Sequence, residues 1–553
     1  MEGKARARIE FETQPDRYRH WKLSFPEAYG GDVARLALDV REDGGLFSGY
    51  ALKLNSYDLG VDIELADALT RIRFEHPETR AVLITSEKPR VFSSGANIYM
   101  LATSSHAFKV NFCKFTNETR IYLEEMSRES NIPSLCALNA TASGGGYELA
   151  LACDEILLVD DGSSVVSLPE AASLGVLPGT GGLTRLSDKR KIRGDIADVF
   201  CTLADGVRGK RAVEWRLVDE TVEKSQFEKA VHRRLAALKA RSPKKRGERR
   251  IDWRPLQAER TATESRYRYV TLRIDEAARV ASLTVDGPTE DQPATMQAIH
   301  EAGVDQWALR AFRELDDALL DLRFNFPTMG LLLIETRGDI ERVRQVDRTL
   351  ASLADDPLVR EILLHARRVL RRLEITSRSV FALIRPGSCF AGSLLELALA
   401  ADRIYMLDGQ PAPRMGFSPL NAGVLANYGG ISRLEARFAC EPDLARELAE
   451  TTDLLDTSEA VGRGMVTFAP DDIDWEDEIR MAIEERTSLS PDALTGLEQN
   501  LRFGGKETME TKIFGRLSAW QNWIFQRPNA VGASGALTRY GKPERPEFDF
   551  ERT

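Results

Sequence analysis

Long apolar runs are missing from this sequence. No stretch approaches the ~18 uninterrupted apolar residues that a membrane-spanning helix needs. The first ten residues, MEGKARARIE, also lack the apolar core of a secretory signal peptide. We therefore expect a cytoplasmic protein with no membrane partner.

Motifs for disulfides and metals are missing as well. The 6 cysteines are scattered without a CxxC pair, which is typical of reduced thiols in the cytoplasm. The 6 histidines include no HExxH pattern, so we expect no bound metal.

Clustered positive charge is scarce. The formal net charge is −10, whereas a nucleic-acid-binding body needs a basic footprint, so no nucleic-acid partner is expected. Hydrophobic residues at 43% and charged residues at 29% indicate an ordinary globular protein. A chain of 553 residues is too long for one ordinary core, which predicts two or three domains.

The sequence repeats itself. YELALACDEILLVD, from Tyr147, resembles LELALAADRIYMLD, from Leu395, and GGLTRL, from Gly181, resembles GGISRL, from Gly429. Both matches have an offset of 248 residues. A repeat of this length predicts two related domains and not a solenoid of short units.

Both copies predict alternating strands and helices. The apolar alternation of VARLALDV and VASLTV is typical of strands. LGVDIELADALTRIRF (59–74) and WALRAFRELDDALLDLRF (307–324) have helical periodicity, and the apolar runs AVLIT and LLLIE follow them as predicted buried strands. The alternation predicts layered α/β units with crossover helices.

Three consecutive glycines, 144–146, open a predicted helix. The first N–H groups of a helix have no partner inside it, and the absent side chains let a ligand oxygen approach them. A second glycine turn, VFSSGANI (91–98), can direct the N–H group of Ala96 toward a pocket. Two converging donors suit an oxygen that gains negative charge. The GxGxxG pattern is absent, so a dinucleotide site is not favoured.

Two glutamates accompany these turns. Glu148 lies in the first turn of the predicted helix, and Glu170 lies in a Pro-rich loop with a short helix. A lone glutamate at a helix start is usually a favourable contact with the helix dipole. Two carboxyl groups near one oxyanion site favour acid/base chemistry, because crowding separates their pKa values.

The motifs VFSSGANI, SGGGYELALACD and LPEAASLGVLPGTGGLTRL resemble the crotonase (enoyl-CoA hydratase/isomerase) superfamily in order and spacing. The resemblance covers residues 33–220, and 270–440 as a degenerate copy. It implies an α/β fold of crotonase-like ββα-superhelix units, duplicated in one chain, with a degenerate second copy and a helical C-terminal region. The implied segments are a catalytic domain (1–245), a basic linker (246–265), a degenerate domain (266–470) and the helical C-terminal region (471–553).

The resemblance assigns roles residue by residue. The N–H groups of Ala96 and Gly145 correspond to the oxyanion hole, and Glu148 and Glu170 correspond to the two glutamates that handle water and protons. Which glutamate is the acid and which the base stays open. A CoA thioester is the implied substrate, and no metal or redox cofactor is expected.

Further residues are expected to contact this substrate. They comprise the segment that lies along CoA, the glycines beside the two donors, and two amides from residues 102–120, namely Leu52, Lys53, Leu54, Gly95, Gly144, Asn111 and Asn117. For Asn111, Cys113 and Asn117 a simple helix face is the alternative interpretation.

The second copy departs from the family pattern. The glycine run becomes Gly392-Ser393-Leu394, and the position that matches Glu170 is Ser418. Glu396 remains. We therefore expect a structural half without its own active site. Since family members form trimers of single domains or multiples of them, a fused pair is expected to form a homodimer.

The segment ATSSHAFKVNFCKFTNETR (102–120) lies where crotonases carry a variable region over the acyl group. With the chain length and the degenerate copy, it resembles a ring-opening lyase branch of the superfamily. This implies conversion of 2,3-epoxy-2,3-dihydrobenzoyl-CoA and water to 3,4-didehydroadipyl-CoA semialdehyde and formate, in aerobic benzoate degradation. The alternatives are an enoyl-CoA hydratase for another acyl-CoA and a non-catalytic acyl-CoA-binding protein.

Overall fold

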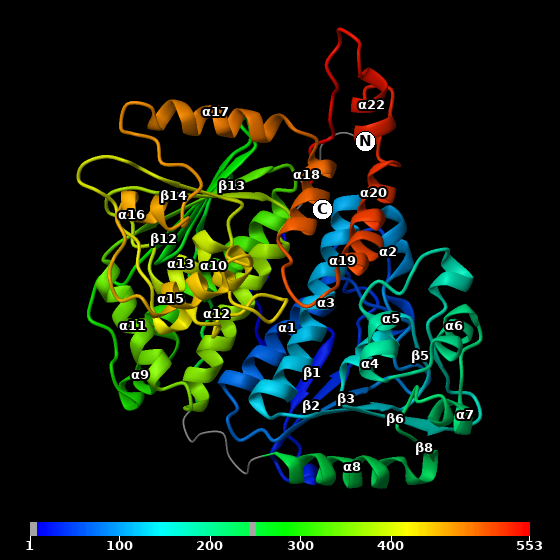
Figure 1. Cartoon of the computed structure of the whole chain (residues 1–553). Coiled ribbons are helices and arrows are strands. Elements are labelled where there is room, and N and C mark those ends of the chain that lie inside the picture. The colour runs from blue at the N-terminus through cyan, green and yellow to red at the C-terminus, as the bar shows by residue number, and fades with distance from the viewer. Residues whose placement is uncertain (1–7, 243–249) are drawn as a thin grey trace. The chain divides into compact units, whose positions relative to one another are not determined.

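The computed structural model describes residues 8–242 and 250–553. The chain forms two compact units. One, the N-terminal unit, spans Glu12–Pro255, and the other, the C-terminal unit, begins at Leu256 and includes the described residues before Glu12. Figure 1 labels their helices and strands.

The N-terminal unit is built on a six-stranded sheet with the order β1-β2-β3-β4-β6-β8. β1 pairs antiparallel with β2, and the later neighbours pair in parallel. The strands are β1 (Trp21–Ser24), β2 (Val33–Leu38), β3 (Ala81–Ser86), β4 (Ser134–Leu138), β6 (Glu155–Asp160) and β8 (Glu220–Glu223), while β5 (Ala142–Ser143) and β7 (Val166–Ser167) pair separately. The helices are α1 (Leu59–Phe74), α2 (Ile98–Thr103), α3 (His106–Ser130), α4 (Gly145–Ala152), α5 (Gly182–Thr184), α6 (Gly194–Thr202), α7 (Gly209–Glu214) and α8 (Phe227–Arg241).

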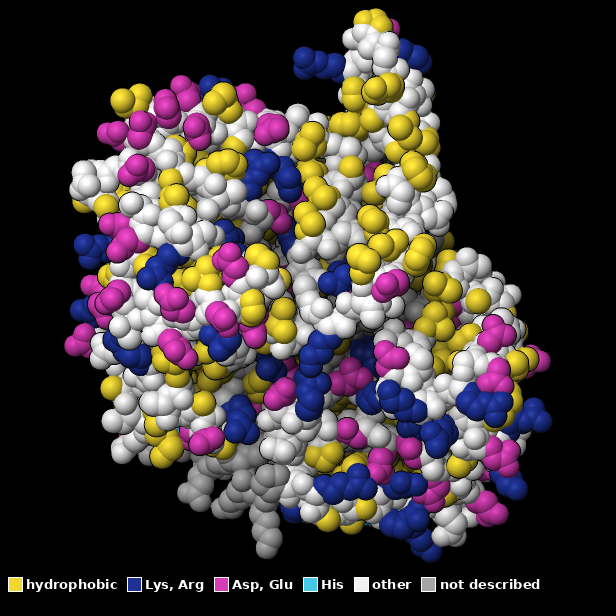
Figure 2. Space-filling view, viewed as in Figure 1, with side chains coloured by type: hydrophobic (Ala, Val, Ile, Leu, Met, Phe, Trp, Pro, Cys, Tyr) yellow, Lys and Arg dark blue, Asp and Glu magenta, His cyan; other side chains and the backbone are white. Residues whose placement is uncertain are grey.

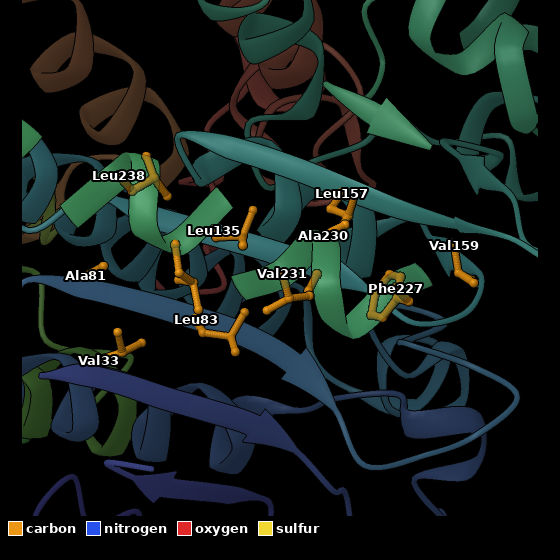
Figure 3. Close-up of a cluster of buried hydrophobic side chains, with 12 residues drawn as sticks. Val33, Ala81, Leu83, Leu135, Leu157, Val159, Phe227, Ala230, Val231 and Leu238 are labelled. Atoms are coloured by element: carbon orange, nitrogen blue, oxygen red, sulfur yellow. The ribbon is translucent and has the colours of Figure 1, made fainter. Parts of the chain in front are cut away.

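Helix α8 covers one face of this sheet, as Figure 3 shows. Side chains alternate along a strand, so every second residue of β3, β4 and β6 meets the helix. The cluster contains Val33, Ala81, Leu83, Leu135, Ala137, Leu157 and Val159 from the strands and Phe227, Ala230, Val231, Leu235 and Leu238 from α8. Each large side chain buried here contributes about 1.5–3 kcal/mol. This packing fixes the strands whose carboxyl ends carry the glycine turns.

Helix α1 begins at Leu59, where the sequence predicts it. The carboxylate of Asp58 accepts hydrogen bonds from the N–H groups of Gly60 (2.9 Å) and Val61 (3.3 Å), which caps the helix. The predicted helix over 59–74 is confirmed. So is the predicted helix over 307–324, which the structure extends by one residue.

Asn55 ties together three segments near the ends of β2 and β3. Its buried amide accepts a hydrogen bond from the N–H of Val40 (2.8 Å) and donates to Ser86 Oγ (3.0 Å) and to the carbonyl of Phe92 (2.8 Å). The segment that precedes α1 is thereby held beside the turn over 91–98.

The C-terminal unit contains a seven-stranded sheet with the order β15-β14-β13-β12-β11-β10-β9. Neighbours from β12 to β15 are parallel and those from β9 to β12 are antiparallel. The strands are β9 (Glu259–Arg260), β10 (Glu264–Arg266), β11 (Val270–Asp275), β12 (Val280–Asp286), β13 (Leu331–Arg337), β14 (Ser379–Ile384) and β15 (Arg403–Met406). The helices that alternate with them are α9 (Met296–Ala302), α10 (Trp307–Asn325), α11 (Ile340–Ser352), α12 (Pro357–Ile375) and α13 (Gly392–Leu399).

Helices dominate the rest of this unit, in agreement with the predicted helical region over 471–553. They are α14 (Arg433–Arg437), α15 (Pro442–Glu450), α16 (Thr457–Gly462), α17 (Trp475–Ser488), α18 (Pro491–Leu501), α19 (Met509–Thr511), α20 (Ser518–Ile524), α21 (Pro528–Val531) and α22 (Ala536–Arg539). Trp475 and Ile479 of α17 pack on Leu331 and Phe381 of the sheet. No helix within the described ranges is both long and apolar enough to cross a membrane.

The prediction of a linker over 246–265 is wrong for the second part of that range. Residues 243–249 lie outside the described residues, but β9 and β10 lie within the expected linker. Ser265 of β10 pairs with Leu272 of β11, so this stretch extends the sheet. The basic, turn-rich composition of this region predicted a linker, because composition alone gives no sign that a segment pairs with a later strand.

Replacing Asn55 with Ala should lower the free energy of unfolding by about 2–4 kcal/mol, because the buried N–H of Val40 and the carbonyl of Phe92 lose their partner. The midpoint of urea unfolding measures this loss. The exposed neighbour Lys53 is the control, since Lys53→Ala should change stability by no more than about 0.5 kcal/mol. Equal midpoints for Asn55→Ala and the unmodified protein would contradict the expected role.

Candidate active site

The two glycine turns predicted from the sequence lie against each other. A Cβ atom added to Gly95 would lie only 2.6 Å from the nitrogen of Gly145 and 3.0 Å from the carbonyl oxygen of Ser143. Gly95 also has φ +84°, a conformation that side chains disfavour. The turns are joined by a hydrogen bond from the N–H of Ser143 to the carbonyl of Ser93 (2.9 Å). Only glycine at position 95 allows this approach.

Each turn presents a backbone N–H group without an acceptor. Tyr57 lies alongside Ala96, donating to the carbonyl of Gly95 (2.9 Å) and accepting from the N–H of Asn97 (2.9 Å). The N–H of Ala96 lies between these bonds and makes none itself within the described residues. The N–H of Gly145, in the first turn of α4, likewise has no acceptor in that part of the chain. The structure therefore brings Ala96 and Gly145 together as the sequence predicts for an oxyanion hole.

The two glycines on either side of Gly145 are also constrained. Gly144 has φ +54° and ψ −132°, and its N–H donates to the carbonyl of Ser167 (2.9 Å). A Cβ atom on Gly146 would lie 2.6 Å from the carbonyl oxygen of Ser93. Backbone contact therefore excludes a side chain at Gly146, and the positive φ disfavours one at Gly144.

Glu148 lies in the first turn of α4 and is buried. Its carboxylate accepts hydrogen bonds from the N–H of Thr180 (3.0 Å), the hydroxyl of Thr180 and the N–H of Gly182 (2.7 Å). A Cβ atom on Gly182 would lie 2.8 Å from the same carboxylate. These donors orient the carboxyl group, and Thr180 is a residue that the sequence analysis missed. The sequence feature that could have identified Thr180 is the glycine-rich stretch PGTGGLTRL around it, which the sequence analysis used only for the family resemblance.

Glu170 lies beside the same glycines. Its carboxylate oxygen Oε1 would be 2.7 Å from a Cβ atom on Gly144, and its Oε2 is buried without a hydrogen-bond partner in the described residues. Burial, together with the charge of Glu148, raises the pKa of Glu170 to about 7. Glu148 and Glu170 are therefore close enough for their charges to interact, and both lie beside the glycine run.

The segment expected to lie along CoA adjoins the turn over 91–98. Leu52 is buried, while Lys53 and Leu54 are exposed. The carbonyl of Leu54 accepts a hydrogen bond from the N–H of Ser94 (3.1 Å), and Leu54 has φ +54°. The segment is thus placed beside the turn over 91–98, with the side chains of Lys53 and Leu54 exposed.

The two amides expected from residues 102–120 lie on α3. Asn117 donates to the carbonyl of Gly179 (3.0 Å), and so supports the loop that carries Thr180. Asn111 is buried and donates to the carbonyl of Ala107 (3.0 Å), while its Oδ1 has no partner in the described residues. Asn117 therefore has a structural contact, and Asn111 retains a free acceptor.

A buried ion pair lies behind the site. Arg120 of α3 and Asp62 of α1 pair at 2.5 Å, and both are almost completely buried. The guanidinium carbon of Arg120 lies 5.5 Å from the centroid of the Tyr57 ring. Neither Tyr57 nor Arg120 was selected from the sequence, because each looks like an ordinary core or helix residue there.

Known proteins resemble the chain over different lengths. The enoyl-CoA hydratase/isomerase family profile matches residues 52–251. A benzoyl-CoA-dihydrodiol lyase from Aromatoleum evansii is 54% identical over 548 residues, which are 98% of each chain. A fatty acid oxidation complex subunit alpha from Shewanella loihica is 35% identical over 186 residues, 33% of this chain and 25% of that protein. A solved enoyl-CoA hydratase from Bacillus anthracis has 26% identity and a TM-score of 0.33, covering 40% of this chain and 76% of its own.

Replacing Glu148 with Gln should lower the pKa of Glu170 from about 7 part of the way toward its ordinary value. The charge of Glu148 is removed, while burial, the larger cause, remains. A ¹³C NMR titration of the glutamate carboxyl carbons measures the pKa, with Glu170→Gln identifying the signal. Glu228→Gln, an exposed change on α8, is the control and should leave the signal unmoved. An unchanged pKa in Glu148→Gln would show that the two carboxyl groups do not interact.

Proposed function

The chain belongs to the enoyl-CoA hydratase/isomerase family, in the branch represented by benzoyl-CoA-dihydrodiol lyase, and on that premise we propose that it has the lyase activity. The proposed reaction converts 2,3-epoxy-2,3-dihydrobenzoyl-CoA and two waters to 3,4-didehydroadipyl-CoA semialdehyde and formate. The observation that carries the proposal is the pair of unoccupied N–H donors beside two glutamates.

The proposed chemistry produces negative charge next to a thioester. The ring epoxide opens toward a seven-membered enol ether, and a first water converts it to a dialdehyde with a formyl group beside the thioester carbonyl. A second water adds to that formyl group. Cleavage of the carbon–carbon bond releases formate, and the bonding electrons stay on the α-carbon as a thioester enolate. A proton delivered to carbon completes the reaction.

The site matches these requirements. The N–H groups of Ala96 and Gly145 would hold the enolate oxygen, and one such donor typically contributes about 10²–10³ in rate. Glu148 and Glu170 would activate the waters and return the proton to carbon, each adding about 10²–10⁴. A pKa of about 7 lets Glu170 both give and accept a proton near neutral pH. Water addition, bond cleavage and proton transfer balance the reaction, so we propose that it needs no metal or redox cofactor.

Substrate contacts follow from the same geometry. We propose that Leu52, Lys53 and Leu54 lie along CoA, because they adjoin the oxyanion turn. Asn111 offers a free acceptor from α3 toward the acyl group, and Asn117 acts through the Thr180 loop. We also propose a cytoplasmic location for the protein, as its cysteines and the chemistry of CoA thioesters suggest.

The C-terminal unit is proposed to be a degenerate second copy. The parallel strand order β12-β13-β14-β15 has the same sequence of crossovers as β2-β3-β4-β6. Ser393, which matches Gly145 in the 248-residue offset, donates its N–H to the buried carboxylate of Asp347 (2.6 Å). Glu396, which matches Glu148, is paired with Arg433 (2.9 Å). In the C-terminal unit the backbone N–H and the glutamate at the matching positions therefore already have partners within the protein.

A homodimer is proposed from the surface of the C-terminal helices. Large apolar side chains are exposed between α18 and α22, among them Leu501, Phe514, Leu517, Leu537 and Tyr540, and Figure 2 shows apolar side chains gathered over these helices. Exposed apolar patches mark interaction sites. A second copy of the chain would present the same apolar surface, so a symmetric pair covers both.

Glu148→Gln and Glu170→Gln should each lower formate release from the epoxide thioester by at least about 10²-fold, because a group that moves protons is lost. Mass spectrometry of the semialdehyde and an enzymatic formate assay measure the rate, and circular dichroism checks the fold. Glu396→Gln is the matched control. Arg433 keeps its bond to Glu374 there (2.7 Å), so this variant should fold and retain activity.

The same assay separates the alternatives. Hydration of crotonyl-CoA without formate release would favour an enoyl-CoA hydratase, and CoA-ester binding without turnover would favour a binding protein. Loss of activity in Glu396→Gln would contradict the degenerate second copy. Formate release at the unmodified rate in Glu148→Gln or Glu170→Gln would remove that residue from the mechanism.

Analytical ultracentrifugation should give twice the mass of one chain. Phe514→Glu places a charge on a side chain that is 74% exposed on the apolar surface, and it should shift the population toward single chains. Lys224→Glu, an exposed charge change in the N-terminal unit, is the control and should leave the mass unchanged. A protein that sediments as one chain before any substitution would contradict the homodimer.

A further inference from the structure

We propose that the hydroxyl of Tyr57 is a third hydrogen-bond donor of the oxyanion hole, acting on the same acyl oxygen as the N–H groups of Ala96 and Gly145. The inference rests on the proposed function for the identity of that oxygen. It adds a residue that neither the sequence motifs nor the two-amide oxyanion hole includes.

The position of the hydroxyl supports this role. A Cβ atom added to Gly145 would lie 1.9 Å from the oxygen of the Tyr57 hydroxyl, so this oxygen lies directly against the α-carbon of Gly145. The N–H group of Gly145 is bonded to that α-carbon, at about 1.46 Å from nitrogen to carbon. An acyl oxygen that accepts a hydrogen bond from Gly145 is therefore within reach of the phenol as well.

The hydroxyl is buried without a regular hydrogen bond. Tyr57 is 3% exposed, and within the part of the chain that the structure describes its hydroxyl has only a contact with the side chain of Thr180, which is itself bonded to Glu148. A buried polar group without a partner normally costs about 1–3 kcal/mol, so such a group calls for an explanation. A substrate oxygen would supply the missing partner.

Three other tyrosine hydroxyls of the N-terminal unit donate to protein acceptors, unlike that of Tyr57. The hydroxyl of Tyr50 donates to Asp58 (2.6 Å), that of Tyr147 donates to the carbonyl of Leu217 (2.7 Å), and that of Tyr18 donates to Asp67. Their burial is explained by protein acceptors, whereas that of Tyr57 is not.

The surroundings keep the phenol neutral and in place. Burial, reinforced by the charges of Asp62 and Glu148, raises the pKa of Tyr57 far above its ordinary value, although Arg120 and the contact with the Thr180 side chain oppose the shift. A neutral phenol donates a hydrogen bond to a developing oxyanion without losing its proton. The guanidinium of Arg120 and the ring of Phe112, whose centroid is 6.0 Å away, both lie near the Tyr57 ring.

The backbone of Tyr57 ties the same residue to the other donor. Its N–H and carbonyl groups bond to Gly95 and Asn97, which flank Ala96. The main chain of Tyr57 thus positions one donor, and its side chain touches the residue that carries the other. Tyr57 therefore contacts both turns, one through its main chain and the other through its hydroxyl.

The test is Tyr57→Phe, which removes the hydroxyl and keeps the ring. We expect kcat for formate release to fall by about 10²-fold, with KM changed less than about threefold, as for loss of one oxyanion donor. The melting temperature should stay unchanged, because the hydroxyl makes no regular hydrogen bond to the described part of the protein. Tyr18→Phe is the control, since it removes a phenol outside the site and should keep the unmodified kcat.

A second readout does not depend on turnover. The carbonyl stretch of ¹³C-labelled benzoyl-CoA bound to the protein reports the donors at the thioester oxygen, and Tyr57→Phe should move it to higher wavenumber. This shift in a protein that releases no formate would overturn the proposed reaction but support the inference. An unchanged stretch, an unchanged kcat, or a kcat loss accompanied by a lowered melting temperature would overturn the role of Tyr57.

Discussion

The close approach of two bare peptide turns is the constraint on which the candidate site depends. Gly95 lies so near the nitrogen of Gly145 that no side chain fits between them. Two N–H groups can point at one oxygen only when their backbones come this close, since a backbone donor has no flexible stem to extend its reach. Glycine is therefore required by contact between the turns as much as by contact with a ligand.

The parallel sheet makes this approach possible. β3 and β4 are neighbours, and the two turns follow their carboxyl ends. In α/β sheets, ligands bind at the carboxyl ends of the strands, where the loops of adjacent strands converge. Packing of α8 on one face of the strands fixes their spacing, and hence the spacing of the turns. The apolar core and the polar site are thus two consequences of one strand arrangement.

Identical residues have different chemistry in the two units because their partners differ. Glu148 accepts hydrogen bonds from the Thr180 loop and lies beside unoccupied amides, whereas Glu396 is held by Asn421 (2.7 Å) and Arg433. In the C-terminal unit the carboxylate of Asp347 already accepts the amide of Ser393. A glutamate at a helix start is therefore only a potential acid or base, and the groups around it decide whether it can act.

The sequence alone determined what depends on short spacing. Apolar periodicity located α1 and α10, the glycine runs located both turns, and the motif order predicted one family site for Ala96, Gly145, Glu148 and Glu170. Only the tertiary structure decided what depends on contacts between distant segments. Thr180 reaches Glu148 from 32 residues away, the hydroxyl of Tyr57 meets Gly145, and β10 joins β11 where a linker was expected. Local patterns record which conformation a segment prefers, but burial, unpaired hydrogen-bonding groups and shifted pKa values arise only when the folded chain brings those segments together.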